Sequence, residues 1–126
     1  MRIGIDAVEV ARFKALALRR GERFLARLFT GEELRYARSA RGDRAYERLA
    51  ARFAVKEALC KAIGERLPFR SIEIGHLETG GPLSVTCSRV RETITASLTH
   101  TRRLAVAVVL LGTDDTAGCT TTGGAK

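Results

Sequence analysis

The order of apolar and polar residues predicts that the chain begins with a strand and continues as helices. An apolar, β-branched run over residues 2–6 predicts a short strand that ends at Asp6. Apolar residues then recur at spacings of three and four over residues 8–28, which is typical of amphipathic helix. Gly21 interrupts this pattern, so we expect it to separate two helices or to kink one.

Two further helices are indicated by the residues at their ends. Thr30 followed three residues later by Glu33 is the pattern of a capping box, so a helix is expected to begin there and to fade in the polar loop 39–43. A second helix is predicted over residues 44–63, where Gly64 supplies a C-terminal stop.

Beyond Pro68 the pattern changes to period two with β-branched residues, which predicts strands over residues 71–74, 83–87, 94–98 and 104–111. The last of these is apolar throughout, so we expect a central strand buried on both faces. Residues 80–82 (Gly-Gly-Pro) indicate a turn, and residues 112–126 a disordered tail. The prediction is an α+β fold with one domain over residues 1–111 and a mainly antiparallel sheet packed on the long helix.

Composition limits the class of protein. A chain of 126 residues with 45% hydrophobic and 29% charged residues is expected to fold as one domain. It has no apolar run of 18 residues, and Asp6 interrupts the first apolar run too early for a signal peptide, so we expect a cytoplasmic protein without a membrane span. Three cysteines without paired spacing argue against a disulfide framework and a zinc site.

The charge is strongly positive. The chain carries 22 Lys and Arg against 14 Asp and Glu, a net charge of +8, and residues 12–27 hold six basic residues and one acid. This balance favours an anionic partner, which would be a nucleic acid, an acidic protein or a phosphate-rich small molecule. The alternative is a solvated basic face.

The predicted helix 44–63 carries charges within an apolar surface. Glu57 and Lys61 are four residues apart and therefore share a helix face, as Arg52 and Lys56 share another. One interpretation is an ordinary ion pair at the surface. The other follows from the apolar neighbours of Glu57, because a carboxylate among them needs a strong partner: Lys61, a bound cation, or a phosphate bridged by a cation.

Asp6 raises the same question. It is a good helix N-cap, and it is also a carboxylate at the end of an apolar strand, where ligands gather in α/β folds. Two such carboxylates, Asp6 and Glu57, suit Mg²⁺, which takes one or two protein carboxylates and completes its shell with water and phosphate oxygens. Lys61 would then meet the remaining phosphate charge.

Two segments resemble a known family. Gly4-Ile5-Asp6, followed about fifty residues later by the run from Arg52 to Ala62, resembles the two-part motif of the 4'-phosphopantetheinyl transferases in their short bacterial form, the holo-[acyl-carrier-protein] synthases. The resemblance covers about residues 1–111 and includes the Gly81-Pro82 turn and the segment 97–101.

The resemblance implies that the chain moves the phosphopantetheine group of coenzyme A onto a serine of apo acyl carrier protein, with release of adenosine 3',5'-bisphosphate, in fatty acid biosynthesis. Asp6 and Glu57 would hold Mg²⁺, and Glu57 and Lys61 would be the catalytic residues, with Lys61 on a phosphate oxygen. The base that removes the serine proton stays open between a metal-bound water and Glu57 acting through water.

The resemblance also implies contacts to coenzyme A. His100 is placed near the nucleotide phosphate, where the residue alone would indicate a histidine in the core or at a strand end. Arg52 is either a phosphate contact or a salt-bridge partner, and Arg44 is a phosphate candidate on the loop. Gly81 and Pro82 either form the wall beside the adenosine or are only a turn.

The resemblance also implies a partner for the basic segment 12–27, because acyl carrier proteins are acidic. The residues expected to dock the carrier protein are Arg12, Leu16, Arg20, Arg23, Phe24 and Arg27. For Phe24, core packing is the alternative.

The resemblance also implies a homotrimer with sites between subunits, so that Asp6 and His100 of one site come from different chains, because a unit of this length takes the second half of its site from another copy. Two departures from the family pattern stand out. Residues 64–67 read Gly-Glu-Arg-Leu where Gly-Thr-Gly is common, and Thr95-Ala96-Ser97 replaces His-Val-Ser. The competing hypotheses are a nucleic-acid-binding module without a metal and a catalytically inactive relative.

Overall fold

The computed structural model describes residues 1–76 and 83–112. Its helices and strands are β1 (Arg2–Glu9), α1 (Val10–Arg20), α2 (Glu22–Leu28), α3 (Gly31–Arg38), α4 (Arg44–Ile63), the 3-10 turn η1 (Phe69–Ser71), β2 (Ile72–His76), β3 (Leu83–Cys87), β4 (Thr93–His100) and β5 (Leu104–Gly112). The predicted turn at residues 80–82 and residues 113–126 of the predicted tail lie outside the described residues.

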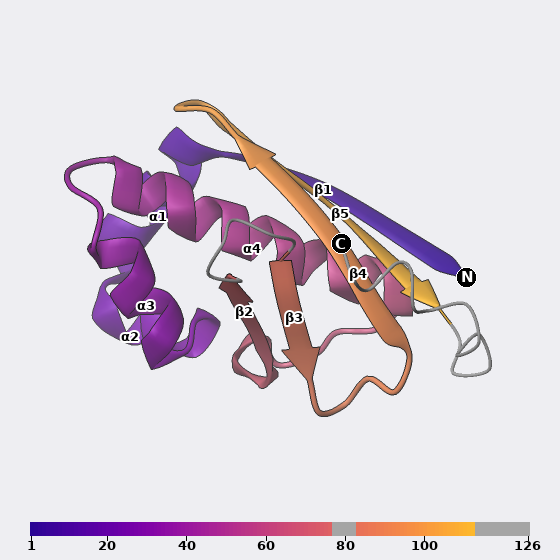
Figure 1. Cartoon of the computed structure of the whole chain (residues 1–126). Coiled ribbons are helices and arrows are strands. Elements are labelled where there is room, and N and C mark those ends of the chain that lie inside the picture. Colours follow the sequence, from indigo (N-terminus) through magenta and orange to yellow (C-terminus); the bar gives the residue numbers. More distant parts are fainter. Residues whose placement is uncertain (77–82, 113–126) are drawn as a thin grey trace.

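The strands form two antiparallel sheets. β5 lies between β1 and β4 in a three-stranded sheet, and β2 pairs with β3 in a separate hairpin. α4 runs along one face of the larger sheet and packs on β1 and β5, while α1, α2 and α3 gather at the N-terminal end of α4 (Figure 1). The predicted α+β class, with antiparallel strands packed on the long helix, is confirmed.

Gly4 sets the distance between β1 and α4. A Cβ at this position would overlap the carbonyl oxygen of Ala58 and lie 2.8 Å from the amide nitrogen of Ala62. A residue without a side chain is therefore required where the strand crosses the helix. This close approach brings the following residues of β1 beside the middle of α4.

Most of the helix ends predicted from capping residues and glycines are confirmed. The capping box is present, since Glu33 N donates to Thr30 Oγ1 and Thr30 N donates to Glu33 Oε1. α4 begins and ends as predicted, and Gly64 adopts the left-handed conformation that ends it. Gly21, also at positive φ, separates α1 from α2.

The predicted end of the first strand was wrong. β1 continues through Glu9, because residues 2–9 pair in register with residues 104–111 of β5, and α1 begins only at Val10. Pairing with a distant strand has overridden the local helical spacing. Asp6 therefore lies in mid-strand, and the interpretation of Asp6 as a helix N-cap is excluded.

β5 is the central strand, as predicted, but only one of its faces is buried. Ala105, Ala107, Val109 and Leu111 pack toward α4. The opposite face carries Val106 and Val108, which are half-exposed, and Leu104, which is 41% exposed. The expectation of burial on both faces is therefore wrong for a single chain.

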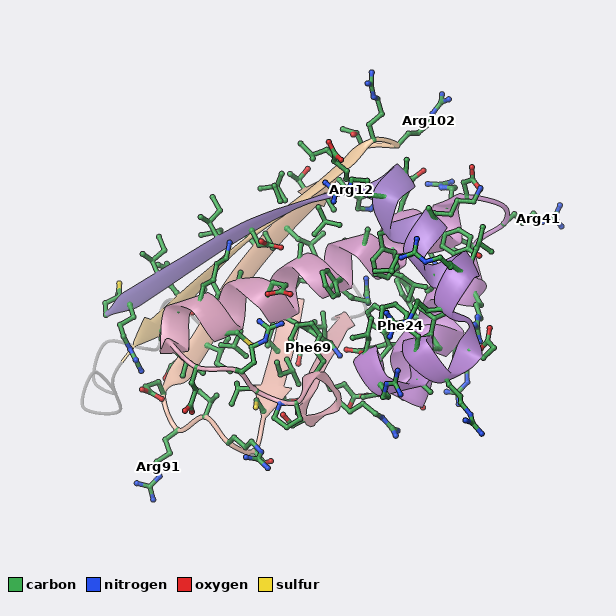
Figure 2. The ribbon with its side chains drawn as sticks, turned by 180° about the vertical axis from the view of Figure 1, so that it is seen from behind. Arg12, Phe24, Arg41, Phe69, Arg91 and Arg102 are labelled. Atoms are coloured by element: carbon green, nitrogen blue, oxygen red, sulfur yellow. The ribbon has the colours of Figure 1, made fainter. Side chains whose placement is uncertain are left out.

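No helix among the described residues is long and apolar enough to cross a membrane. Cys60 and Cys87 are buried free thiols, and Cys119 lies outside the described residues. The arginines at positions 41, 91 and 102 extend from the outline of the molecule, whereas Phe24 and Phe69 lie within it (Figure 2).

Candidate active site

Asp6 and Glu57 line the same groove, although 51 positions separate them in the sequence. The groove has a volume of about 890 Å³ and lies between the end of β1, α1 and α4. Period-two alternation places Gly4, Asp6 and Val8 on the face of β1 that looks toward α4. Both carboxylates are mostly buried, with side chains 16% exposed for Asp6 and 20% for Glu57.

Lys61 is held by β1. Its Nζ donates to Asp6 Oδ1 at 3.0 Å and to the Ile5 carbonyl oxygen at 3.1 Å. Lys61 thus provides a positive charge beside the groove, on the same face of α4 as Glu57. The surface pair between Glu57 and Lys61 that the spacing suggested is replaced by this contact to Asp6.

Glu57 is paired with Arg66, a residue that the sequence analysis did not single out. Arg66 Nη1 donates to Glu57 Oε1 at 3.0 Å, and Nη2 donates to Oε2 at 3.2 Å. The hydrogen bond to Glu57 raises the pKa of the Arg66 guanidinium above its ordinary value. The sequence did hold one indication of this contact. Arg66 comes two residues after Gly64, the residue that ends α4, so its side chain can reach back to the last turns of the helix.

The donor set fits a hard divalent cation that also binds phosphate. No three His, Cys, Asp or Glu side chains gather in the described residues as they do in a metal site made by protein alone. Mg²⁺ needs less, since it is commonly held by one or two carboxylates, water and substrate phosphates. Asp6 and Glu57 supply two carboxylates to one groove, and Lys61 adds a cation for phosphate.

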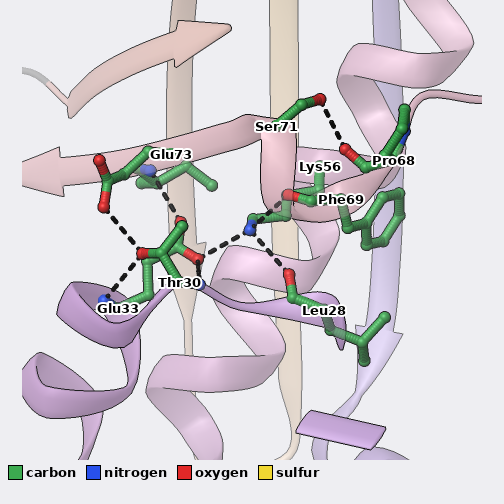
Figure 3. A network of polar contacts seen from close by, with 9 residues as sticks. Leu28, Thr30, Glu33, Lys56, Pro68, Phe69, Ser71 and Glu73 are labelled. Atoms are coloured by element: carbon green, nitrogen blue, oxygen red, sulfur yellow. Dashed lines mark hydrogen bonds and ion pairs between the residues drawn. The ribbon is translucent and has the colours of Figure 1, made fainter. Parts of the chain in front are cut away.

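A fully buried ion pair supports α4 next to Glu57. Lys56 and Glu33 are both 0% exposed, and Lys56 Nζ donates to Glu33 Oε1 at 2.7 Å (Figure 3). Lys56 also donates to the carbonyl oxygens of Leu28 and Phe69, at 2.8 and 2.9 Å. Burial lowers the pKa of Lys56, and Glu33 opposes that effect. The pair joins α2, α3, α4 and η1 in one network.

Arg52 lies on another face of α4. It is buried and lines a cavity of about 510 Å³ with residues of α3, β2 and β3. Its guanidinium carbon is 4.3 Å from the centroid of the Tyr36 ring, and burial lowers its pKa. This environment is compatible with both interpretations of Arg52, a contact to phosphate and a salt-bridge partner within the chain.

His100 and Arg44 lie together near the start of α4. His100 Nδ1 is 3.3 Å from Glu47 Oε1, and Arg44 shares a cavity of about 520 Å³ with Glu47. Among the described residues, the groove of Asp6 and Glu57 is lined by none of Arg44, Arg52 and His100. Gly81 and Pro82 lie outside the described residues. One chain therefore presents the predicted coenzyme contacts in separate places.

The residues predicted to dock a carrier protein lie on α1 and α2. Arg12 and Leu16 line the groove of the two carboxylates, so the basic surface continues into the candidate site. Arg20 lies over the ring of Phe24, 5.0 Å from its centroid, and Phe24 also packs against a buried cluster that includes Phe13 and Leu25. Arg23 and Arg27 are exposed on α2.

Comparison with known proteins identifies the family. The sequence profile of the 4'-phosphopantetheinyl transferase superfamily matches residues 2–109. Holo-[acyl-carrier-protein] synthase from Carboxydothermus hydrogenoformans is 39% identical over 122 residues, covering 88% of this chain and 97% of that protein. The same enzyme from Listeria welshimeri is 37% identical over 113 residues, covering 86% and 95%.

Solved structures agree with this assignment. A holo-(acyl-carrier-protein) synthase from Bacillus anthracis, in complex with CoA (3',5'-ADP), superposes with a TM-score of 0.80 at 32% identity, covering 90% of this chain and 96% of that chain. The Helicobacter pylori enzyme, in complex with coenzyme A, has a TM-score of 0.75 at 26% identity, covering 87% and 99%. The chain belongs to the 4'-phosphopantetheinyl transferase superfamily, within its group of holo-[acyl-carrier-protein] synthases. The resemblance stated from the motifs, and the prediction of an enzyme, are confirmed.

Proposed function

We propose that this chain transfers the 4'-phosphopantetheine group of coenzyme A to a serine of apo acyl carrier protein and releases adenosine 3',5'-bisphosphate in a reaction that depends on Mg²⁺. The observation that carries the proposal is the meeting of Asp6 and Glu57 in one groove beside Lys61. The names of the relatives and the coenzyme A complexes of two of them support the same substrates.

The reaction joins the serine oxygen to the phosphorus that carries the pantetheine arm and breaks the bond from that phosphorus to the bridging diphosphate oxygen. The serine proton is released to water, and the leaving group departs as adenosine 3',5'-bisphosphate. Negative charge grows on the departing phosphate, so positive charge placed there lowers the barrier.

Asp6 and Glu57 are the residues that would hold Mg²⁺, which when bound neutralises charge on the diphosphate. Lys61 serves the same purpose as a fixed charge, because Asp6 and the Ile5 carbonyl oxygen orient its ammonium group. Phe53 lines the wall of the groove next to Glu57 and gives it an apolar side.

The coenzyme contacts are proposed to come from two copies of the chain. Arg44, Arg52 and His100 would bind the nucleotide end, but they lie outside the groove that contains Asp6 and Glu57. A second copy that brings these residues to the groove would complete the site. The proposed assembly is a homotrimer with three such interfaces, since a head-to-tail contact closes as a ring.

The exposed face of the three-stranded sheet is the surface that would meet the second copy. Ile3 and Ile5 are 63% and 60% exposed, and Val106 and Val108 continue the apolar face across β5. Such a continuous apolar face is unusual on a chain that stays alone in water.

The carrier protein is proposed to dock on α1 and α2. An acidic partner complements Arg20, Arg23 and Arg27, and Arg12 and Leu16 lie where the docking surface meets the groove. Charge attraction of this kind raises the association rate and weakens as salt is added.

The test is intact-mass spectrometry of an apo acyl carrier protein incubated with coenzyme A, Mg²⁺ and this protein. We expect the carrier to gain one phosphopantetheine group. The gain should disappear without the metal, slow at high salt, and fall by at least about a hundredfold in Asp6→Asn or Glu57→Gln, the size of effect seen when an electrostatic catalytic group is removed. Arg41→Gln, on an exposed loop, is the control. No mass gain on several carrier proteins would contradict the proposal and favour an inactive relative.

A further inference from the structure

The carboxylate of Glu57 already has a cation bound to both of its oxygens. Arg66 presents the two nitrogens of its guanidinium fork, Nη1 to Oε1 at 3.0 Å and Nη2 to Oε2 at 3.2 Å. A guanidinium fork on both oxygens neutralises the carboxylate and repels a second cation that approaches the same oxygens. Arg66 and a divalent cation therefore compete for one carboxylate.

The two cations of the site are held differently. Lys61 is anchored by a backbone carbonyl of β1 as well as by Asp6, so it is fixed to the sheet. Arg66 follows the end of α4 at Gly64, and its guanidinium carbon is 5.3 Å from the centroid of the Phe69 ring. Its side chain is 68% exposed, against 20% for Glu57, so the cation of this pair is open to water while the carboxylate is not. Arg66 therefore has room to move into solvent when another cation takes its place on Glu57.

We propose that Arg66 is a resident counter-cation of Glu57, which neutralises this carboxylate in the metal-free protein and which a divalent cation displaces on binding. The inference rests on the proposed metal-binding function of Asp6 and Glu57. It assigns a role to one of the residues by which this chain departs from the Gly-Thr-Gly pattern after the motif helix. Only the fraction of molecules in which Arg66 has released Glu57 binds the metal with full affinity, so the observed dissociation constant exceeds the intrinsic one.

Replacing Arg66 should therefore tighten metal binding. In the full chain, Arg66→Gln keeps a polar side chain of similar reach and removes the charge. Because only the Arg66 end of the pair is exposed, we expect a dissociation constant for Mn²⁺ that is about threefold to fivefold lower than in the wild-type protein. The measurement is calorimetric titration of Mn²⁺, with and without saturating coenzyme A, alongside a thermal melt that verifies folding.

Two controls separate the ion pair from general charge effects. Arg41→Gln removes the same charge from the exposed loop before α4, and it should leave Mn²⁺ binding unchanged within about 1.5-fold, because a distant exposed charge is screened. In a Glu57→Gln background, adding Arg66→Gln should change Mn²⁺ binding no more than Arg41→Gln does.

The outcomes distinguish this inference from the proposed function. If neither the wild-type protein nor Arg66→Gln binds Mn²⁺, the metal site itself is wrong. If the wild-type protein binds Mn²⁺ and Arg66→Gln binds it equally or more weakly, the role given to Arg66 is overturned while the metal site stands. An equal gain in affinity for Arg41→Gln also overturns it, since the effect would then come from net charge.

Discussion

At the scale of single residues, the candidate site depends on a residue without a side chain. Gly4 allows β1 to touch α4 at Ala58 and Ala62, and two residues later the same strand presents Asp6 to Lys61. The small side chains of the helix are part of the same contact, since larger ones would move the strand outward. Gly4 therefore acts on the site through backbone position.

Gly4→Ala should destabilise the protein and separate the carboxylates. Its Cβ would meet the backbone of α4, which cannot yield as a side chain can, so we expect the free energy of unfolding to fall by about 3 kcal/mol. Urea unfolding measures the change, and Mn²⁺ binding reports the displacement of Asp6. Gly75→Ala is the matched control, because a Cβ there meets no atom within 4 Å, and its effect should stay within about 0.5 kcal/mol. Equal stability of both variants would contradict this account.

Residue type was enough to select the charged side chains of the candidate site, but not to predict their ion pairs. Asp6, Glu57 and Lys61 were identified because charges in apolar segments need partners. Which cation takes which carboxylate depends on the return of the chain after Gly64 and on the register of β1. Neither is a local property, so the sequence offered Lys61, a bound cation or a bridged phosphate as the partner of Glu57 and did not point to Arg66, which the structure pairs with it.

At the scale of elements, α4 was predicted to the residue, whereas β1 was predicted three residues too short. Both ends of the helix are determined by residues next to them in the sequence, a polar loop before Arg44 and Gly64 after Ile63. The end of β1 is determined instead by β5, whose partners lie about a hundred positions away. The buried pair of Lys56 and Glu33 was also missed, because burial of a lysine depends on what η1 and α3 place over it.

The network around Lys56 is expected to hold these elements together. Lys56→Met leaves Glu33 charged and buried without its cation, so we expect the free energy of unfolding to fall by about 3 kcal/mol. Urea unfolding tests this, and the double variant Lys56→Met/Glu33→Gln should recover part of the loss. The control is Arg35→Met, which breaks an exposed pair with Glu32 and should cost no more than about 0.5 kcal/mol. A similar cost for both single variants would show that the buried pair contributes little.

At the scale of the whole molecule, one chain holds the two proposed parts of the site, the metal-binding carboxylates and the coenzyme contacts, in separate places. Asp6 and Glu57 line the groove beside α1, and Arg44 and His100 lie at the start of α4. The outer face of β5 is only half-buried in one chain, although its apolar sequence is typical of a strand covered on both sides. This face therefore also lacks a partner surface in the single chain. A second copy would supply both the missing cover and the missing residues.

Mixing two inactive variants should therefore restore activity. Asp6→Asn removes one part of the site and the double variant Arg44→Ala/His100→Ala removes the other, so each should be nearly inactive alone. If the chains exchange evenly and each site takes its two parts from neighbouring subunits, about one quarter of the sites in the mixture are intact. The readout is phosphopantetheine transfer after the two proteins are unfolded and refolded together, with light scattering to give the assembly mass.

Val108→Glu in both chains provides the control, because a charge on the outer face of β5 should prevent assembly and abolish the recovery. Ser88→Glu, on the exposed turn after β3, adds the same charge away from the outer face of β5 and from α1, and it should leave the recovery intact. Activity that stays at the level of the separate variants, with assembled protein present, would mean that each chain builds its site alone.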